Sequence, residues 1–182
     1  MLQAAFEAPP DVLYHGTKDP KPLLAANTFD WARTQSRDLG YFGRGFYAAL
    51  SVEHARRYGP HVLAIRLRSG ARLLDGLAGT ESPRSMLVPM RIPTYQAALR
   101  AFVPTIAPID RRERVLEEFD DLYDPASASF DRLGWYALVT KWVEKSGVAA
   151  GVRWGSEVVL TDPAAIASVS KVRQARARRA VS

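Results

Sequence analysis

Short strand patterns at both ends of the chain, separated by helical patterns, constrain the fold more than any other feature. The clearest strand is 61–68, in which apolar and basic side chains fall on opposite faces. Further strands are expected at 11–15, 46–49, 148–154, 157–161 and 168–172. The strand at 46–49 follows a glycine-rich and aromatic loop that begins at residue 40.

The helical patterns occupy the middle of the chain. We expect helices at 94–102, 110–123 and 134–147, and a shorter one after Ser51, which is placed to cap it. Segment 134–147 is the clearest, because its apolar residues recur at helical spacing and Gly147 follows them: Trp135, Leu138, Val139, Trp142 and Val143. We assign both tryptophans to the core. Strand runs separated by helical runs predict an α+β fold.

The length of 182 residues suits one well-buried domain. We expect a loose lead-in at 1–10, a single domain at 11–172 and a basic tail at 173–182. The stretch 75–93 contains Gly, Ser and Pro and predicts a long loop.

Composition excludes several classes of site. The chain has no cysteine, so disulfides and thiolate metal sites cannot form, and with three histidines no metal is expected. No apolar run reaches the roughly 20 residues that a membrane-spanning helix needs, and the N-terminus shows no signal-peptide pattern. We expect a cytoplasmic site of action, and delivery into a target cell without a cleaved signal peptide stays open.

The net charge of +6 comes mostly from the C-terminal end. Lys171 and four arginines after it supply five of those charges, so the remaining body is about +1. A basic tail is typical of a solvated terminus, and the alternative is an arm that binds nucleic-acid phosphates.

Three short motifs contain residues suited to chemistry. In the first, residues 14–17, His15 ends an apolar strand and Gly16 permits close approach of a ligand. In the second, residues 43–51, Tyr47 stands on a strand after two glycines and offers a stacking surface for a planar ring. In the third, residues 154–160, Glu157 opens an apolar strand, where its carboxylate could stabilise an oxocarbenium-like cation.

Each motif also has a purely structural explanation. In the order given, these are a histidine near a turn whose hydrogen bonds are satisfied, a bulged strand, and a carboxylate that faces solvent on an edge strand. Neither a P-loop nor a Rossmann glycine pattern is present.

Taken in this order, the three motifs resemble the ADP-ribosyltransferase superfamily, in its His-Tyr-Glu branch of diphtheria-type toxins and poly(ADP-ribose) polymerases. The resemblance covers about residues 11–68 and 148–172. It implies a split pair of β-sheets around an NAD cleft, with helices inserted between the strand-rich ends.

The resemblance also assigns roles. His15 is expected to contact the adenosine-side ribose of NAD⁺, and Gly16 the nicotinamide amide, with Thr17 beside them. Tyr47 would stack on the nicotinamide ring near Ser51, and Glu157 would bond the ribose 2′-hydroxyl. Adenine-side candidates are Arg37, Asp38 and Tyr41.

The chain departs from the arginine-modifying branch of the superfamily. That branch carries an arginine where His15 stands and a second glutamate where Gly155 stands, so modification of arginine is disfavoured.

The implied activity is mono-ADP-ribosyl transfer from NAD⁺ to a macromolecular acceptor, either protein or nucleic acid. By analogy such a chain acts as a toxin or effector and has a neutralising antitoxin or immunity protein. The loop 75–93 and helix 110–124 are expected to frame the acceptor entrance.

Four alternatives stay open. Two are enzymes: an NAD⁺ glycohydrolase, and an NAD-dependent RNA 2′-phosphotransferase that would use His54, Arg56 and Arg57. The others are a non-enzymatic nucleic-acid-binding module and an inactive scaffold.

Overall fold

The computed structural model describes residues 5–24, 42–78, 95–123 and 132–172. Its strands are β1 (Phe6–Glu7), β2 (Leu13–Thr17), β3 (Phe46–Ala49), β4 (His61–Leu67), β5 (Leu73–Asp75), β6 (Gly151–Trp154), β7 (Glu157–Leu160) and β8 (Ile166–Lys171). Its helices are α1 (Lys21–Leu24), α3 (Val52–Ala55), α4 (Tyr95–Ile106), α5 (Arg112–Leu122) and α6 (Arg132–Ser146), with 3₁₀ turns η1 (Ile109–Arg111) and η2 (Pro163–Ala165). The predicted α+β class is confirmed.

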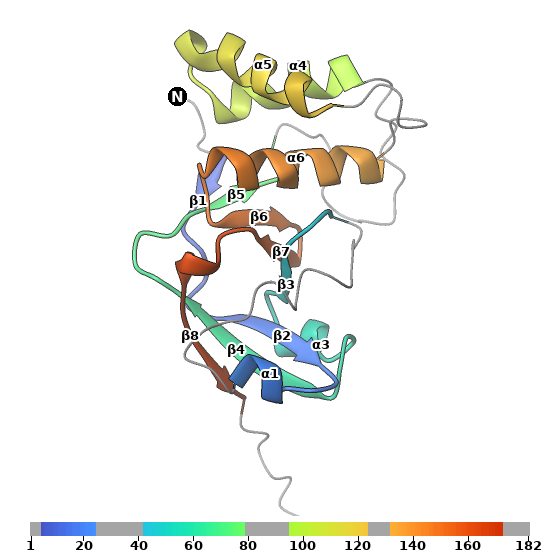
Figure 1. The fold of residues 1–182 in the computed structure, drawn as a ribbon, viewed down its shortest axis with the longest axis vertical. Helices are drawn as coiled ribbons and strands as arrows, with labels where there is room; N and C mark the ends of the chain where they lie inside the picture. The colour runs from blue at the N-terminus through green and yellow to red at the C-terminus, as the bar shows by residue number, and fades with distance from the viewer. Residues whose placement is uncertain (1–4, 25–41, 79–94, 124–131, 173–182) are drawn as a thin grey trace, which may run out of the picture.

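The described strands form one hydrogen-bonded sheet in the order β1-β5-β6-β7-β3-β2-β4-β8. All neighbouring strands are antiparallel except β5 and β6, which are parallel. The weakest link is between β2 and β3, where only Tyr14 and Ala49 are paired. The two strands diverge after this pair, so β2 and β4 lie below β3 and β7 in Figure 1, and β5 and β6 lie above.

Helices α4, α5 and α6 form two further layers on one side of the sheet, whereas the short helices α1 and α3 lie beside β2 and β4 (Figure 1). Helix α6 lies against the sheet and is buried on both sides, because α4 and α5 cover its outer face. Trp135 and Trp142 of α6 are in this core, as expected, and both stack on Phe119 of α5. The helix ends at Gly147, whose φ of 64° and bond to the Val143 carbonyl confirm the expected cap.

The other face of the sheet encloses a second core. Its buried side chains come from β2, β3, β4, β5 and β7 and from Leu23 of α1, and partly buried residues of β8 pack against them. Since these strands span nearly the whole order of the sheet, the sheet curls around this core.

Two short strands lie where no strand was expected. The lead-in is not loose throughout, because Phe6 and Glu7 form β1 and pair with Leu74 and Leu73. Residues 73–75, at the edge of the expected long loop, form β5. The rest of that loop, residues 79–94, and the basic tail lie outside the described residues.

Candidate active site

Glu157 stands at the first position of β7, directly after the two-residue turn Gly155–Ser156. Gly155 has φ of 64°, which a glycine adopts without strain in such a turn. Strand β7 lies between β6 and β3, so Glu157 is on an interior strand and only 8% exposed. The explanation as a solvent-facing edge carboxylate is therefore wrong.

Tyr47 lies on the same face of the sheet as Glu157. It pairs with Val159, while Glu157 pairs with Ala49 two residues further along β3. Side chains in this diagonal relation on adjacent strands are about 7 Å apart. The structure thus brings these two predicted site residues together.

The Tyr47 hydroxyl fastens the loop that precedes β3. It donates a hydrogen bond of 2.6 Å to the Gly43 carbonyl and accepts one of 3.1 Å from the Phe42 amide. Gly43 has φ of 93°, which explains the first glycine of the motif. At Gly45 a side chain would collide with Val159 and Leu160 of β7, which explains the second.

His15 lies where β2 and β3 diverge. Its Nδ1 is 2.7 Å from the Tyr47 carbonyl oxygen, and its ring is 4.5 Å from that of Phe46. A carbonyl oxygen can only accept, so Nδ1 donates. Burial lowers the pKa of His15, and its bond to the Tyr47 carbonyl opposes this effect only in part. The ring is therefore neutral at neutral pH and Nε2 carries a lone pair.

This burial predicts a pH-dependent stability. Below the ordinary pKa of 6.5, His15 takes up a proton more readily in the unfolded chain than in the folded one. The free energy of unfolding should therefore fall as the pH drops below that value. His15→Asn keeps a donor for the Tyr47 carbonyl but does not titrate, so it should reduce the fall. Urea midpoints of both proteins at pH 7.5 and pH 5.5 measure it, and an equal fall in both would contradict the assignment.

Two side chains that the sequence motifs did not identify for this role contact Glu157: His54 on helix α3, and Tyr58 beyond the end of that helix. The His54 Nε2 is 2.8 Å from the Glu157 Oε1, and the Tyr58 hydroxyl donates a hydrogen bond to the same oxygen. The pKa of Tyr58 rises to about 12, first because its hydroxyl is shielded from water beside Glu157, although the residue as a whole is 57% exposed, and then because of this bond. Tyr58 therefore stays protonated and remains a donor at neutral pH.

The other expected site residues that the structure describes make local structural contacts. Ser51 caps α3 by accepting a 3.1 Å bond from the His54 amide. The Thr17 hydroxyl bonds Asp19 in an exposed turn at the end of β2. Gly16 packs against the Ala55 carbonyl of α3. Tyr41, Arg37 and Asp38 lie outside the described residues.

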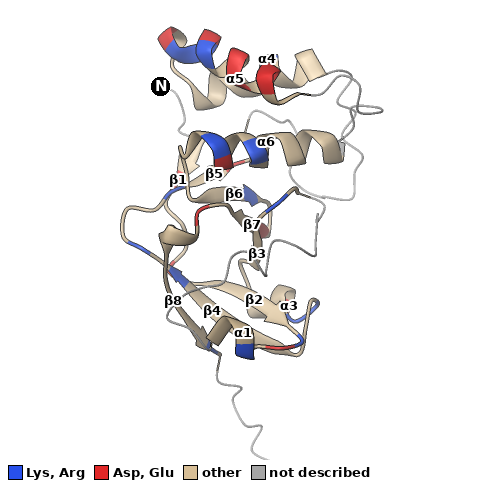
Figure 2. Ribbon diagram, viewed as in Figure 1, with Lys and Arg blue, Asp and Glu red and all other residues tan. Residues whose placement is uncertain are grey.

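The predicted surroundings of the acceptor need correction. Helix α5 lies beyond α6, in the layer farthest from the sheet, where its charged residues are visible in Figure 2. It therefore does not border Glu157. For the phosphotransferase alternative, His54 bonds Glu157, while Arg56 and Arg57 are exposed at the end of α3.

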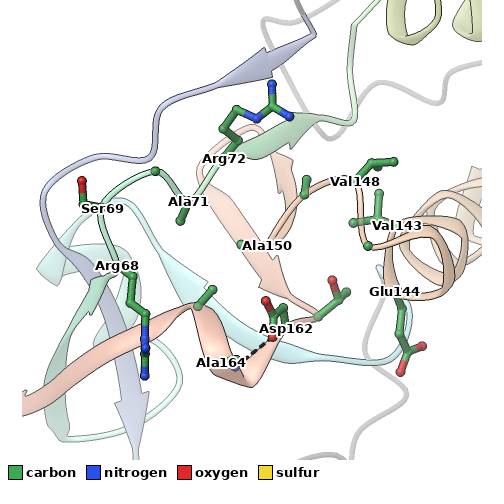
Figure 3. A pocket seen from close by; sticks show the side chains of 15 residues that line it. Arg68, Ser69, Ala71, Arg72, Val143, Glu144, Val148, Ala150, Asp162 and Ala164 are labelled. Carbon is green, nitrogen blue, oxygen red and sulfur yellow. Dashed lines mark hydrogen bonds between the residues drawn. The ribbon is translucent and has the colours of Figure 1, made fainter.

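A cavity of about 530 Å³ lies at the opposite end of the β6–β7 hairpin from Glu157. Figure 3 shows that the guanidinium groups of Arg68 and Arg72 at its border extend away from Asp162 and from each other. They do not converge on a common point, as a phosphate site would require.

Within the described ranges, no group of three His, Asp or Glu residues is placed to hold a metal ion. None of the described helices is long and apolar enough to cross a membrane.

No family model and no curated protein matches the chain. Among solved structures, the chain is similar to a crystal structure of an anti-CRISPR protein, at 18% sequence identity and a TM-score of 0.38. The match covers 88% of this chain and 94% of that one.

Proposed function

We propose that this protein is an NAD⁺-dependent mono-ADP-ribosyltransferase whose central catalytic group is Glu157. One observation carries the proposal: a buried carboxylate opens an interior strand on the same face as Tyr47, and the Tyr47 carbonyl in turn holds His15. A hydrogen bond joins His15 to Tyr47, whereas Glu157 shares with Tyr47 only its face of the sheet. The divergence of β2 and β3 after Tyr14 also fits the split sheet that the resemblance implies.

The charge of Glu157 suits the chemistry. Among the described residues, its hydrogen-bond partners are His54 and Tyr58, and neither lysine nor arginine pairs with it. A carboxylate without such a permanent cation can stabilise positive charge that develops on a substrate. In NAD⁺ that charge develops on the ribose as its bond to nicotinamide breaks.

The reaction needs few steps from the protein. The C1′–nitrogen bond of NAD⁺ breaks and its electron pair leaves with nicotinamide, which becomes neutral. Glu157 bonds the ribose 2′-hydroxyl and stabilises the cationic ribose. An acceptor then forms a bond to C1′ and loses a proton. Positioning and electrostatics supply the rate, as in other glycosyl transfers.

His15 has a binding role in this scheme. Because its Nδ1 donates to the Tyr47 carbonyl and the ring is neutral, Nε2 would accept a hydrogen bond from a ribose hydroxyl. Tyr47 thus fixes the orientation of the His15 ring, and the ring of Tyr47 is the one that would stack on nicotinamide.

The acceptor class is a protein or a nucleic acid. Transfer to water would make the protein an NAD⁺ glycohydrolase, and both activities release nicotinamide. A role as a toxin or effector with a neutralising antitoxin or immunity protein rests on the analogy alone.

The two functions of Tyr47 can be separated by substitution. Tyr47→Phe keeps the aromatic face but leaves the Phe42 amide without its acceptor. It should therefore lower the free energy of unfolding by about 1 kcal/mol and change the activity little. Tyr47→Ala removes the stacking surface and should weaken NAD⁺ binding about tenfold. Calorimetric titration and urea unfolding of both variants measure the two effects. Equal NAD⁺ affinity of Tyr47→Ala and wild type would exclude stacking on this ring.

The test of the proposed activity is release of nicotinamide from NAD⁺ by the purified protein, with and without a cell extract. Release that requires the extract supports transfer, and equal release without it supports hydrolysis. Absence of release under both conditions, together with salt-sensitive binding of nucleic acid, would favour the binding-module alternative.

A further inference from the structure

His54 and Glu157 are 103 residues apart in the chain but in direct contact. The Nε2–Oε1 distance is 2.8 Å, and the two side chains are 18% and 11% exposed. A hydrogen bond shielded in this way restricts both side chains more than an exposed one would.

The contact fixes the tautomer of His54. An ionised carboxylate oxygen can only accept, so Nε2 of His54 carries the proton and donates it. In the neutral ring Nδ1 then has the lone pair, and it lies 3.4 Å from the Ser156 hydroxyl, which can donate to it. One imidazole thus contacts two consecutive side chains at the start of β7.

The two oxygens of Glu157 are used differently. Oε1 accepts from both His54 and Tyr58, whereas Oε2 has no hydrogen-bond partner among the residues that the structure describes. Tyr58 is the less restrained donor, because it lies beyond the end of α3 and is 57% exposed. His54 provides the better fixed of the two contacts.

We propose that His54 is a positioning residue that anchors Oε1 of Glu157, so that Oε2 is the oxygen offered to the ribose of NAD⁺. The role of Oε2 rests on the proposed function, whereas the anchoring of Oε1 does not. A carboxylate free to rotate would present either oxygen, and its alignment with the substrate would be lost in part of the molecules.

Two local features hold His54 in place. Ser51 caps the helix through the His54 amide itself. At Gly16 of β2, an added Cβ would lie 1.8 Å from the Ala55 carbonyl oxygen, so the absence of a side chain lets α3 approach the sheet. The glycine of the His-Gly-Thr motif therefore sets the position from which His54 reaches Glu157.

The kinetic test compares His54→Leu with His54→Gln, which retains an N–H donor. We expect His54→Leu to lower kcat about 10- to 100-fold with little change in the KM for NAD⁺. His54→Gln should recover most of the loss. His61→Leu is the matched control, because His61 lies on β4 and pairs with Thr17 rather than Glu157. An unchanged kcat in folded His54→Leu, or no recovery in folded His54→Gln, would overturn the proposal.

A second measurement does not depend on turnover. Ring nitrogen NMR signals should show His54 protonated at Nε2, and this signal should shift in Glu157→Gln while that of His61 does not. A ring protonated at Nδ1 but not at Nε2, or a signal insensitive to Glu157→Gln, would overturn the anchoring of Oε1. If the wild type releases no nicotinamide but the signals are as expected, the proposed function fails and the anchoring of Oε1 stands.

Discussion

Replacing Glu157 with glutamine is expected to abolish nicotinamide release while NAD⁺ binding survives. Glutamine has nearly the same shape and still offers an oxygen to His54 and Tyr58, so the surroundings should be preserved. It lacks the negative charge that would stabilise the cationic ribose. Loss of such an electrostatic contribution lowers turnover by about 10²- to 10³-fold or more. Initial rates of nicotinamide release and calorimetric titration with NAD⁺ measure the two quantities.

Glu53→Gln is the control for this substitution. Glu53 is on α3 next to His54 but is exposed, so the control removes a nearby carboxylate without changing the site. Near-normal turnover in Glu157→Gln would refute the assignment of Glu157 as the central catalytic group. Equal losses of turnover and NAD⁺ affinity would assign Glu157 to binding rather than to the transition state.

The largest effect on stability is expected from Gly16→Ala. The new Cβ would lie 1.8 Å from the Ala55 carbonyl oxygen and 2.7 Å from its carbon. These are backbone atoms, so α3 must move away from β2. We expect a loss of about 3 kcal/mol, at the upper end of the cost of overpacking, and a loss of turnover because α3 carries His54.

Urea unfolding measures the loss, with Ser69→Ala as a control at an exposed loop position. A shift of the unfolding midpoint no larger than that of the control would show that α3 does not depend on Gly16. Normal turnover in a destabilised Gly16→Ala variant would instead show that activity does not depend on the position of α3.

Local patterns in the sequence predicted the longer elements of the fold. Alternation identified β4, helical spacing identified α6, and the cap at Ser51 identified the start of α3. The missed strands β1 and β5 have two and three residues. Strands this short carry no periodicity, and they exist because each pairs with a neighbour distant in the chain.

The site was predictable where a motif marks it and not where tertiary structure completes it. The motifs indicated His15, Tyr47 and Glu157 in the order that the resemblance requires. They could not indicate that His54 and Tyr58 meet Glu157. One signal was available: α3 follows β3 within three residues, so any strand that pairs with Ala49 comes close to this helix.

The central claim is tested most directly by incubating the protein with labelled NAD⁺ and a cell extract, beside Glu157→Gln. The products are then digested separately with protease and with nuclease. We predict that label enters a macromolecule only with the wild type, and that one of the two digestions releases it and so identifies the acceptor class. Label found only in free ADP-ribose would make the protein a hydrolase. Unchanged NAD⁺ with both proteins would contradict the account.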